Sequence, residues 1–334
     1  HSTEHISLPD WADLMIIAPA TANVLSKMAH GIADDALTTT FAAMRKPIVI
    51  APAMNTHMYE SPATQQAICM LSQWDNITML DAASGELACG TTGKGRMQEV
   101  DVLAAAVEYA LTPKTLMGKR VLITAGPTQE AIDPVRYISN ASTGKMGYAL
   151  VRACLNRGAE VTLITGPTHL SLQAWQTFCP LKIVNVVSSA EMCEATISAF
   201  KQADITILCA AVADFTPCKI ADRKLKKQEL STINSQLSIE LTTTTDIAAT
   251  LGKEKGEKLL IGFALETHDE QANALRKLQS KNLDMIVLNS LQDSGAGFGV
   301  DTNKVTLLYT DGTKKDLPLL LKQEVADAII EALH

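Results

Sequence analysis

The sequence predicts an α/β protein with two open parallel-sheet domains, because short apolar runs alternate with helical periodicity in both halves of the chain. In the first half the runs have the length and composition of buried strands. We expect strands at 14–18, 47–51 and 77–80 and helices near 22–30, 62–72 and 100–110. Pro113 and Gly118 then interrupt the pattern. The break predicts a first domain over 1–111, a linker over 112–118 and a second domain over 119–334.

The second half repeats the alternation and predicts a Rossmann-like sheet. The expected strands are 120–124, 160–165, 182–187, 204–209, 258–263 and 284–289, and the expected helices lie near 144–157, 189–202, 269–280 and 318–333. The apolar run 305–309 precedes Asp311 and Gly312, a pair typical of hairpin turns. We therefore expect an antiparallel strand near one edge of this sheet.

The composition favours small ligands and self-association. Hydrophobic residues make up 47% of the 334 residues and charged residues only 19%, which suits buried sheets and surfaces covered by neighbouring subunits. The net charge of -7 argues against binding to nucleic acid or to a membrane surface. No apolar run approaches the roughly 20 residues that span a bilayer. The 7 cysteines form no CxxC pair, so neither a zinc site nor a disulfide framework is indicated, and a reducing cytoplasm fits best.

The segment 125–147 is the strongest functional signal in the chain. It joins an expected strand to an expected helix, and we interpret it as a long loop without regular structure, a kind of loop that is usually functional. Ser142, Thr143 and Gly144 present hydroxyls and backbone N–H groups at the start of the helix, which suits an anion. A simple helix cap is the alternative, but Asn140 and Arg136 in the same segment are not explained by capping.

Two common phosphate motifs are excluded. Walker A would place a glycine where Ser139 stands, and GxGxxG is absent from the chain. Thr165 and Gly166 end the next expected strand, where an NAD-binding enzyme carries an acid for the ribose. A nicotinamide-dependent dehydrogenase is therefore disfavoured.

A second polar cluster follows the expected strand 204–209. Small residues there would let a ligand approach the backbone, and Asp214 could accept hydrogen bonds from it or hold a metal; the alternative is an ordinary capping or surface aspartate. The basic run 223–227 contains Lys224. Taken alone such a run is usually a solvated surface, but beside an anion site we interpret it as a basic loop that closes over a triphosphate.

These segments, AGPTQEAIDPVRYISNASTGKMG, CAAVADF, RKLKK and GFALET, resemble the ligase half of the bifunctional phosphopantothenoylcysteine decarboxylase/phosphopantothenate-cysteine ligase family of coenzyme A biosynthesis. The resemblance implies ligation of 4'-phosphopantothenate with cysteine, driven by CTP through an acyl-cytidylate and assisted by Mg²⁺. It implies that Asn140 contacts the intermediate, that Lys224 is essential, and that Ser142, Thr143 and Gly144 form the phosphate loop. The CTP pocket would further include Ala210, Asp214, Asp246, Phe263, Lys277 and Lys281.

The first half carries two strand-end motifs, Ala18-Pro-Ala-Thr-Ala-Asn23 and Ala51-Pro-Ala-Met-Asn55. Small residues at strand ends line ligand crevices in open α/β sheets, although tight connections are the alternative. These motifs resemble the flavin-dependent decarboxylase half of the same family, which implies flavodoxin-like topology and FMN. The implied residues are His5 as base, Asn55 for the substrate carboxylate, Cys89 as proton donor, and Thr21, Asn23, Met54 and Met58 around FMN and substrate.

The family's first domain begins with an earlier strand and a phosphate-binding loop that do not occur here, so we expect this domain to be N-terminally incomplete. The resemblance also implies a dimer of the ligase half, a trimer of the flavoprotein half, and small molecules as the ligands. Two other functions stay open at this point. A non-catalytic flavoprotein-type binding subunit could share the first fold, and an NAD-dependent oxidoreductase could share the second.

Overall fold

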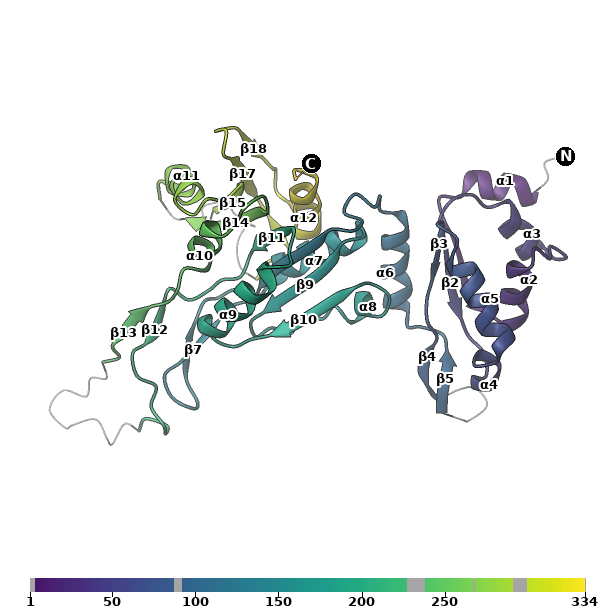
Figure 1. Cartoon of the computed structure of the whole chain (residues 1–334), viewed down its shortest axis with the longest axis horizontal. Helices are drawn as coiled ribbons and strands as arrows, with labels where there is room; N and C mark the ends of the chain where they lie inside the picture. Colours follow the sequence, from purple (N-terminus) through teal and green to yellow (C-terminus); the bar gives the residue numbers. More distant parts are fainter. Residues whose placement is uncertain (1–3, 87–91, 227–237, 267, 291–298, 334) are drawn as a thin grey trace. The chain divides into compact units, whose positions relative to one another are not determined.

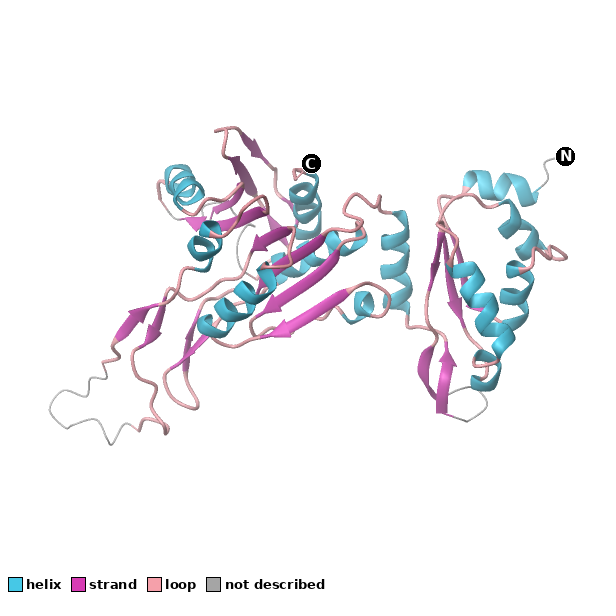
Figure 2. Ribbon diagram, viewed as in Figure 1, coloured by secondary structure: helices cyan, strands magenta, loops and turns pink. Residues whose placement is uncertain are grey.

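The computed structural model describes residues 4–86, 92–226, 238–266, 268–290 and 299–333. The chain forms two compact units. The first contains residues 1–115 together with 156–158 and 173–179, and the second contains 116–155, 159–172 and 180–334. Each unit contains a parallel sheet and helices, which confirms the predicted α/β class (Figures 1 and 2).

The first unit is built on a three-stranded parallel sheet of order β1-β2-β3. Its strands are β1 (Met15–Ala20), β2 (Ile48–Pro52) and β3 (Ile77–Met79), and a separate antiparallel hairpin pairs β4 (Ala83–Glu86) with β5 (Thr92–Arg96). Its helices are α1 (Glu4–Trp11), α2 (Ala22–Ala29), α3 (Ala36–Ala43), α4 (Thr56–Tyr59), α5 (Pro62–Ser72), α6 (Val100–Leu111) and α8 (Gln173–Gln176).

The central strand β2 explains why this sheet is covered on both faces. Ile48 and Ile50 pack in one core with Leu25 of α2 and Leu71 of α5, whereas Val49 packs in a second core that α6 and α8 cover. Side chains of a strand alternate between faces, so a strand buried on both sides has to be apolar throughout. The run Ile-Val-Ile-Ala-Pro is buried at every position.

The second unit contains an eight-stranded sheet of order β10-β9-β6-β11-β14-β15-β17-β18. The parallel strands are β6 (Arg120–Ala125), β9 (Glu160–Thr165), β10 (Leu181–Asn185), β11 (Ile205–Leu208), β14 (Leu259–Glu266) and β15 (Met285–Ser290). Antiparallel β17 (Val305–Tyr309) and β18 (Lys314–Asp316) follow at one edge. The predicted antiparallel strand at 305–309 is therefore confirmed.

Helices and short hairpins complete the second unit. The helices are α7 (Lys145–Asn156, whose last residue belongs to the first unit), α9 (Ser189–Phe200), α10 (Ile247–Lys253), α11 (Glu270–Ser280) and α12 (Lys322–Glu331). The antiparallel pairs are β7 (Gln129–Ala131) with β8 (Tyr137–Ser139), β12 (Phe215–Pro217) with β13 (Leu241–Thr243), and β16 (Thr302–Asn303) with β19 (Leu320–Leu321).

Two local expectations were wrong. The segment 125–147 is not without regular structure, because β7 and β8 pair within it around the turn that contains Asp133 and Pro134. The last helix begins at Lys322 rather than at 318, because Leu320 and Leu321 pair with β16 instead. Both errors concern strands of two or three residues, which are too short for a two-residue period to be recognised.

Candidate active site

The chain order of the second sheet reverses between β6 and β11, and a cavity opens there. From β6 the chain continues outward to β9 and β10, whereas β11, β14 and β15 extend the sheet in the other direction. Open α/β sheets bind ligands at the carboxyl ends of strands beside such a switch point. A cavity of about 670 Å³ lies at this edge. It is lined by four continuous segments, 140–147, 208–215, 243–248 and 262–265, and by the single residues Thr124, Lys277, Lys281, Leu283, Ile286, Asn289, Asn303 and Lys322.

The cavity brings together most of the predicted ligase residues. All but Lys224 line it: Asn140, Ser142, Thr143, Gly144, Ala210, Asp214, Asp246, Phe263, Lys277 and Lys281. Lys224 is exposed and lies outside the lining residues, at the end of the described segment 92–226. Residue 227 of the predicted basic run lies outside the described residues.

The turn before α7 is shaped by close backbone contacts. Gly144 adopts a φ of +79°, and a Cβ there would lie 3.3 Å from Gly126 Cα. A Cβ on Gly147 would lie 2.4 Å from Ala125 Cβ, so the first turn of α7 packs directly on the end of β6. Because the first N–H groups of a helix have no partner within the helix, a helix start is suited to anions, and this close packing brings the start of α7 to the cavity wall.

Asn140 connects the two loops that flank the switch point. Its Nδ2 donates to the carbonyl oxygens of Ala211 and Val212, both at 3.1 Å. Thr128 Oγ1 accepts from Ala213 N at 2.9 Å in the same region. These bonds hold the loop after β6 against the loop after β11, so both walls of the cavity have a fixed spacing.

Two predicted lysines pair with carboxylates in the structure. Lys277 Nζ lies 2.7 Å from Glu266 Oε1, and Lys281 Nζ lies 2.9 Å from Asp246 Oδ2. Burial alone would raise the pKa of Asp246, but the hydrogen bond from Ala249 N–H and the ion pair with Lys281 outweigh it and lower that pKa. The carboxylate is therefore ionised at neutral pH and forms its ion pair with Lys281 beside the cavity.

Sequence reasoning missed a second pair of lysines. Lys145 lines the cavity and pairs with Asp301 at 2.7 Å, while the buried Lys322 donates to the carbonyl oxygens of Val300 and Thr302. Burial lowers the pKa of Lys322. Lys145 sits in the recognised motif, but Lys322 begins a helix far along the chain and no local pattern distinguishes it.

Two further lining residues carry useful chemical information. Asn289, at the end of β15, has a buried Oδ1 without a hydrogen-bond partner among the described residues, which leaves an acceptor available to a ligand. Burial raises the pKa of Cys209 to about 12, so this cysteine is a neutral thiol. The cavity therefore offers donors, acceptors and cations rather than a thiolate nucleophile.

In the first unit, the predicted strand-end residues lie on two loops that meet. Ala53 N donates to Ala20 O at 3.0 Å, which joins the loop after β2 to the end of β1. Thr21 caps α2 by accepting from Val24 N, and Asn55 caps α4 by accepting from His57 N. Met54 N donates to Gly95 O of the β4–β5 hairpin. These residues thus have structural roles at the same sheet edge where a ligand was predicted.

The other predicted decarboxylase residues are more dispersed. Asn23 and Met58 are exposed on α2 and α4, and His5 is exposed on α1, which packs against α3. Cys89 lies outside the described residues.

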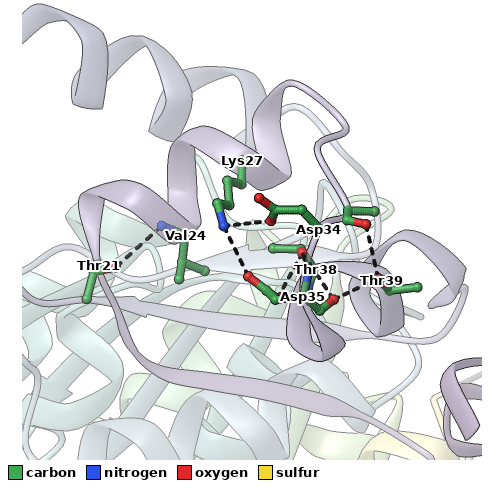
Figure 3. A network of polar contacts seen from close by, with 8 residues as sticks. Thr21, Val24, Lys27, Asp34, Asp35, Thr38 and Thr39 are labelled. Atoms are coloured by element: carbon green, nitrogen blue, oxygen red, sulfur yellow. Dashed lines mark hydrogen bonds and ion pairs between the residues drawn. The ribbon is translucent and has the colours of Figure 1, made fainter.

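The segment after α2 forms a polar network with a structural purpose (Figure 3). Lys27 Nζ lies 2.6 Å from Asp34 Oδ1 and 3.2 Å from Asp35 Oδ2. Asp35 also caps α3 by accepting from Thr38 N at 2.8 Å. The two acidic residues therefore fix the connection between α2 and α3.

Within the described ranges, no group of three or more His, Cys, Asp or Glu side chains is arranged to hold a metal ion. A helix long and apolar enough to cross a bilayer is likewise absent from the part of the chain that the structure describes.

Comparison with known proteins identifies both halves. Residues 1–111 match the family model described as Flavoprotein, and residues 116–334 match the model described as DNA/pantothenate metabolism flavoprotein C-terminal domain. The chain is 48% identical over 332 residues to the coenzyme A biosynthesis bifunctional protein CoaBC of Bacillus subtilis (strain 168), which covers 98% of this chain and 79% of that protein.

Two further relatives are similar. A cysteine/cysteine sulfinic acid decarboxylase from an unknown prokaryotic organism is 48% identical over 335 residues, covering 98% of this chain and 90% of that protein. A crystal structure of the C-terminal domain of a coenzyme A biosynthesis bifunctional protein CoaBC is 42% identical with a TM-score of 0.54, covering 66% of this chain and 96% of that one. The family resemblance read from the sequence motifs is confirmed, and the chain belongs to the family of coenzyme A biosynthesis bifunctional proteins, enzymes with a ligase role and a decarboxylase role.

Proposed function

We propose that the cavity of the second unit catalyses the CTP-dependent ligation of 4'-phosphopantothenate with cysteine. One observation carries this proposal. The residues that the family resemblance predicts for a CTP site come from separate segments, and all of them except Lys224 line a single cavity at the switch point of the sheet. The cavity combines a helix start suited to phosphate with lysines at 145, 277, 281 and 322. An anionic nucleotide matches this lining better than a neutral ligand does.

The chemistry follows from the charges. In the first step a carboxylate oxygen of phosphopantothenate attacks the α-phosphorus of CTP, the bond to the β-phosphate oxygen breaks, and pyrophosphate leaves. Negative charge grows on the phosphoryl oxygens and on the leaving group, and fixed cations and N–H groups stabilise it. In the second step the neutral amine of cysteine attacks the acyl carbon, the bond to the phosphate oxygen breaks, CMP leaves with its electron pair, and the nitrogen releases a proton as the amide forms.

Asn140 is the proposed contact to the acyl-cytidylate. It stands at the junction of the two loops, where the α-phosphate and the acyl group would meet. Asp214, Asp246 and Phe263 would surround the nucleoside, and Lys224 would add a cation from outside the cavity wall. We expect Mg²⁺ to be held largely by the nucleotide phosphates, because this ion is commonly bound through one or two carboxylates and substrate oxygens.

Pyrophosphate release from CTP in the presence of phosphopantothenate and cysteine tests the proposal. We expect Lys224→Ala to reduce turnover about 100-fold or more, the scale found when one charge-stabilising donor is removed. Lys219→Ala is a matched control, since Lys219 is also an exposed lysine of the same segment. Folded protein that releases no pyrophosphate would exclude the ligase reading, and equal losses in both variants would remove Lys224 from the site.

For the first unit we propose FMN-dependent decarboxylation of the ligation product, which the Flavoprotein match supports. The residues present suit a flavin in part: the hydroxyl of Thr21, the amide of Asn55 and the backbone after β2 lie at one sheet edge, and Thr56 Oγ1 is buried without a partner among the described residues. When bound, FMN would take up a hydride equivalent from the substrate and return it. Asn55 would orient the substrate carboxylate, and His5 and Cys89 would move protons.

Visible flavin absorbance of the purified protein and carbon dioxide release test this half. Phosphopantothenoylcysteine should be the better substrate, and free cysteine is the informative competitor because one relative is named as a cysteine decarboxylase. A preference for free cysteine would overturn the substrate assignment while leaving the flavin chemistry in place.

Self-association of the second unit is part of the proposal. The β7–β8 and β12–β13 hairpins project from the sheet (Figure 1) and carry exposed apolar side chains at Val135, in the turn between β7 and β8, and at Tyr137, Phe215 and Leu241. Such a cluster marks an interaction surface, and we assign it to a dimer of this half. The trimer of the flavoprotein half, the cytoplasmic location and the domain limits at 111 and 119 stay predictions from the sequence.

A further inference from the structure

The carboxylate of Asp133 is fully buried although it lies in the turn of the β7–β8 hairpin. It accepts from the backbone N–H groups of Val135 and Arg136, both at 2.8 Å, and from Arg136 Nε at 2.9 Å. A further donor comes from a distant part of the chain: Leu225 N lies 3.1 Å from Asp133 Oδ2. Several charge-assisted bonds therefore hold this carboxylate in one position.

Arg136 completes the contact from the other side. Its Nη2 donates to Leu225 O at 2.7 Å while the same guanidinium pairs with Asp133. Both backbone polar groups of Leu225 are thus bound by one ion pair, which we call the Asp133–Arg136 clamp. Ala221 N also donates to Ile132 O at 3.0 Å, so the chain is fastened to the hairpin at two points.

The bond to Leu225 N–H acts on Lys224 directly. The N–H of Leu225 and the carbonyl of Lys224 belong to the same planar peptide group, so fixing the first fixes the second. The Lys224 side chain is exposed and starts from this fixed backbone. On the other side of the clamp, β8 ends at Ser139, immediately before Asn140. The clamp therefore links the backbone of Lys224 to the hairpin whose last strand, β8, ends directly before Asn140.

We propose that Asp133 is a positioning residue for the ligation reaction, acting through the backbone of Leu225 to place Lys224 relative to Asn140. This inference rests on the proposed ligase function and on the role given there to Lys224. Its physical basis is that a long lysine side chain directs its charge well only if its backbone is fixed. A displacement of about 1 Å can cost on the order of 100-fold in rate.

A double-mutant cycle tests the inference with Asp133→Asn, Lys224→Ala and the combination. Asn has nearly the shape of Asp but cannot pair ionically with Arg136. We expect Asp133→Asn to lower kcat/KM about tenfold or more in the wild-type background and by less than about threefold in the Lys224→Ala background, since residues that act together are not additive. Losses that multiply independently would overturn the inference.

Asp204→Asn is a matched control. Asp204 also accepts from a backbone N–H, Arg120 N at 2.9 Å, and pairs with the same arginine through Nε and Nη2, but at the opposite end of β6. It should leave kcat/KM unchanged. If Lys224→Ala alone has the wild-type rate, the role of Lys224 in the proposed function is refuted. If Lys224→Ala is impaired and Asp133→Asn is not, the positioning role of Asp133 is refuted and the proposed function stands.

Amide hydrogen exchange provides a readout that does not depend on turnover or on variant stability. In the wild-type protein the Leu225 amide should exchange at least about tenfold more slowly than those of Lys224 and Lys226, because it is bound to a buried carboxylate. In Asp133→Asn this protection should fall while strands β6 and β11 keep theirs. Equal exchange rates at all three amides of the wild type would overturn the inference even if the variant does not fold.

Discussion

The turn before α7 yields the sharpest prediction, Gly144→Ala. At a φ of +79° an alanine is strained by about 1–2 kcal/mol. Its Cβ would also lie 3.3 Å from Gly126 Cα and 3.4 Å from Gly126 N, and this backbone has little room to move away because Ala211 N donates to Gly126 O at 2.9 Å. The melting temperature of this unit should fall by about 2–8 °C, since 1 kcal/mol corresponds to roughly 2–4 °C at this size.

The effect on catalysis should be larger than the effect on stability. If the added methyl group displaces one backbone N–H from a phosphate oxygen, the lost charge-assisted hydrogen bond is worth about 1.5–3 kcal/mol. That corresponds to a decrease of roughly 10- to 150-fold in kcat/KM for CTP, at about 1.4 kcal/mol per factor of ten. Pyrophosphate release at varied CTP, together with thermal unfolding of the same samples, measures both quantities.

Gly312→Ala separates strain from function. Gly312 has a φ of +83° in the turn between β17 and β18, and a Cβ there would meet nothing within 4 Å. Its backbone strain is therefore similar, but it lies outside the cavity. We expect a comparable loss of stability with normal kinetics. If Gly144→Ala shows the same kinetics as Gly312→Ala, the turn is only a helix cap and the phosphate assignment is refuted.

Three other predictions follow from single contacts. The Arg120 side chain lowers the pKa of Asp204 to about 2. The stabilisation by the Asp204 carboxylate is therefore complete above the ordinary aspartate pKa near 3.8 and is lost as the pH falls through 2. Allowing for solvent screening, Asp204→Asn should cost about 1 kcal/mol of stability at pH 6 and nothing near pH 1, and an equal cost at both pH values would contradict this explanation. Lys281→Met should raise the KM for CTP about tenfold, because it removes a cation beside the cavity. Lys253→Met, at an exposed lysine of α10, should leave the KM unchanged, and equal KM values for the two variants would argue against a nucleotide beside Lys281. Gly147→Ala should lower stability by about 1–3 kcal/mol, because its Cβ would lie 2.4 Å from Ala125 Cβ, and an unchanged unfolding curve would show that α7 can shift without cost.

Much of the fold could be predicted because its signals are local. The run Ile-Val-Ile-Ala-Pro of β2 is apolar on both faces, and this alone indicates a strand buried between helices. The hairpin at 305–309 was recognisable from Asp311 and Gly312. The strands β7 and β8 could not be predicted, because three residues in a polar loop carry no period, and the pairing depends on the buried Asp133 at the turn.

The sequence by itself determined the family and most of the residues predicted to line the cavity, because long unusual segments such as 125–147 occur in a fixed order and their polar residues stand at strand ends. Only the tertiary structure showed that Lys145, Asn289 and Lys322 line the same cavity, and that Asp133 reaches Leu225 across 92 positions of sequence. Contacts of this kind depend on which strand lies beside which, and the order β6-β11-β14-β15 is a result of packing the whole sheet rather than a property of any one segment.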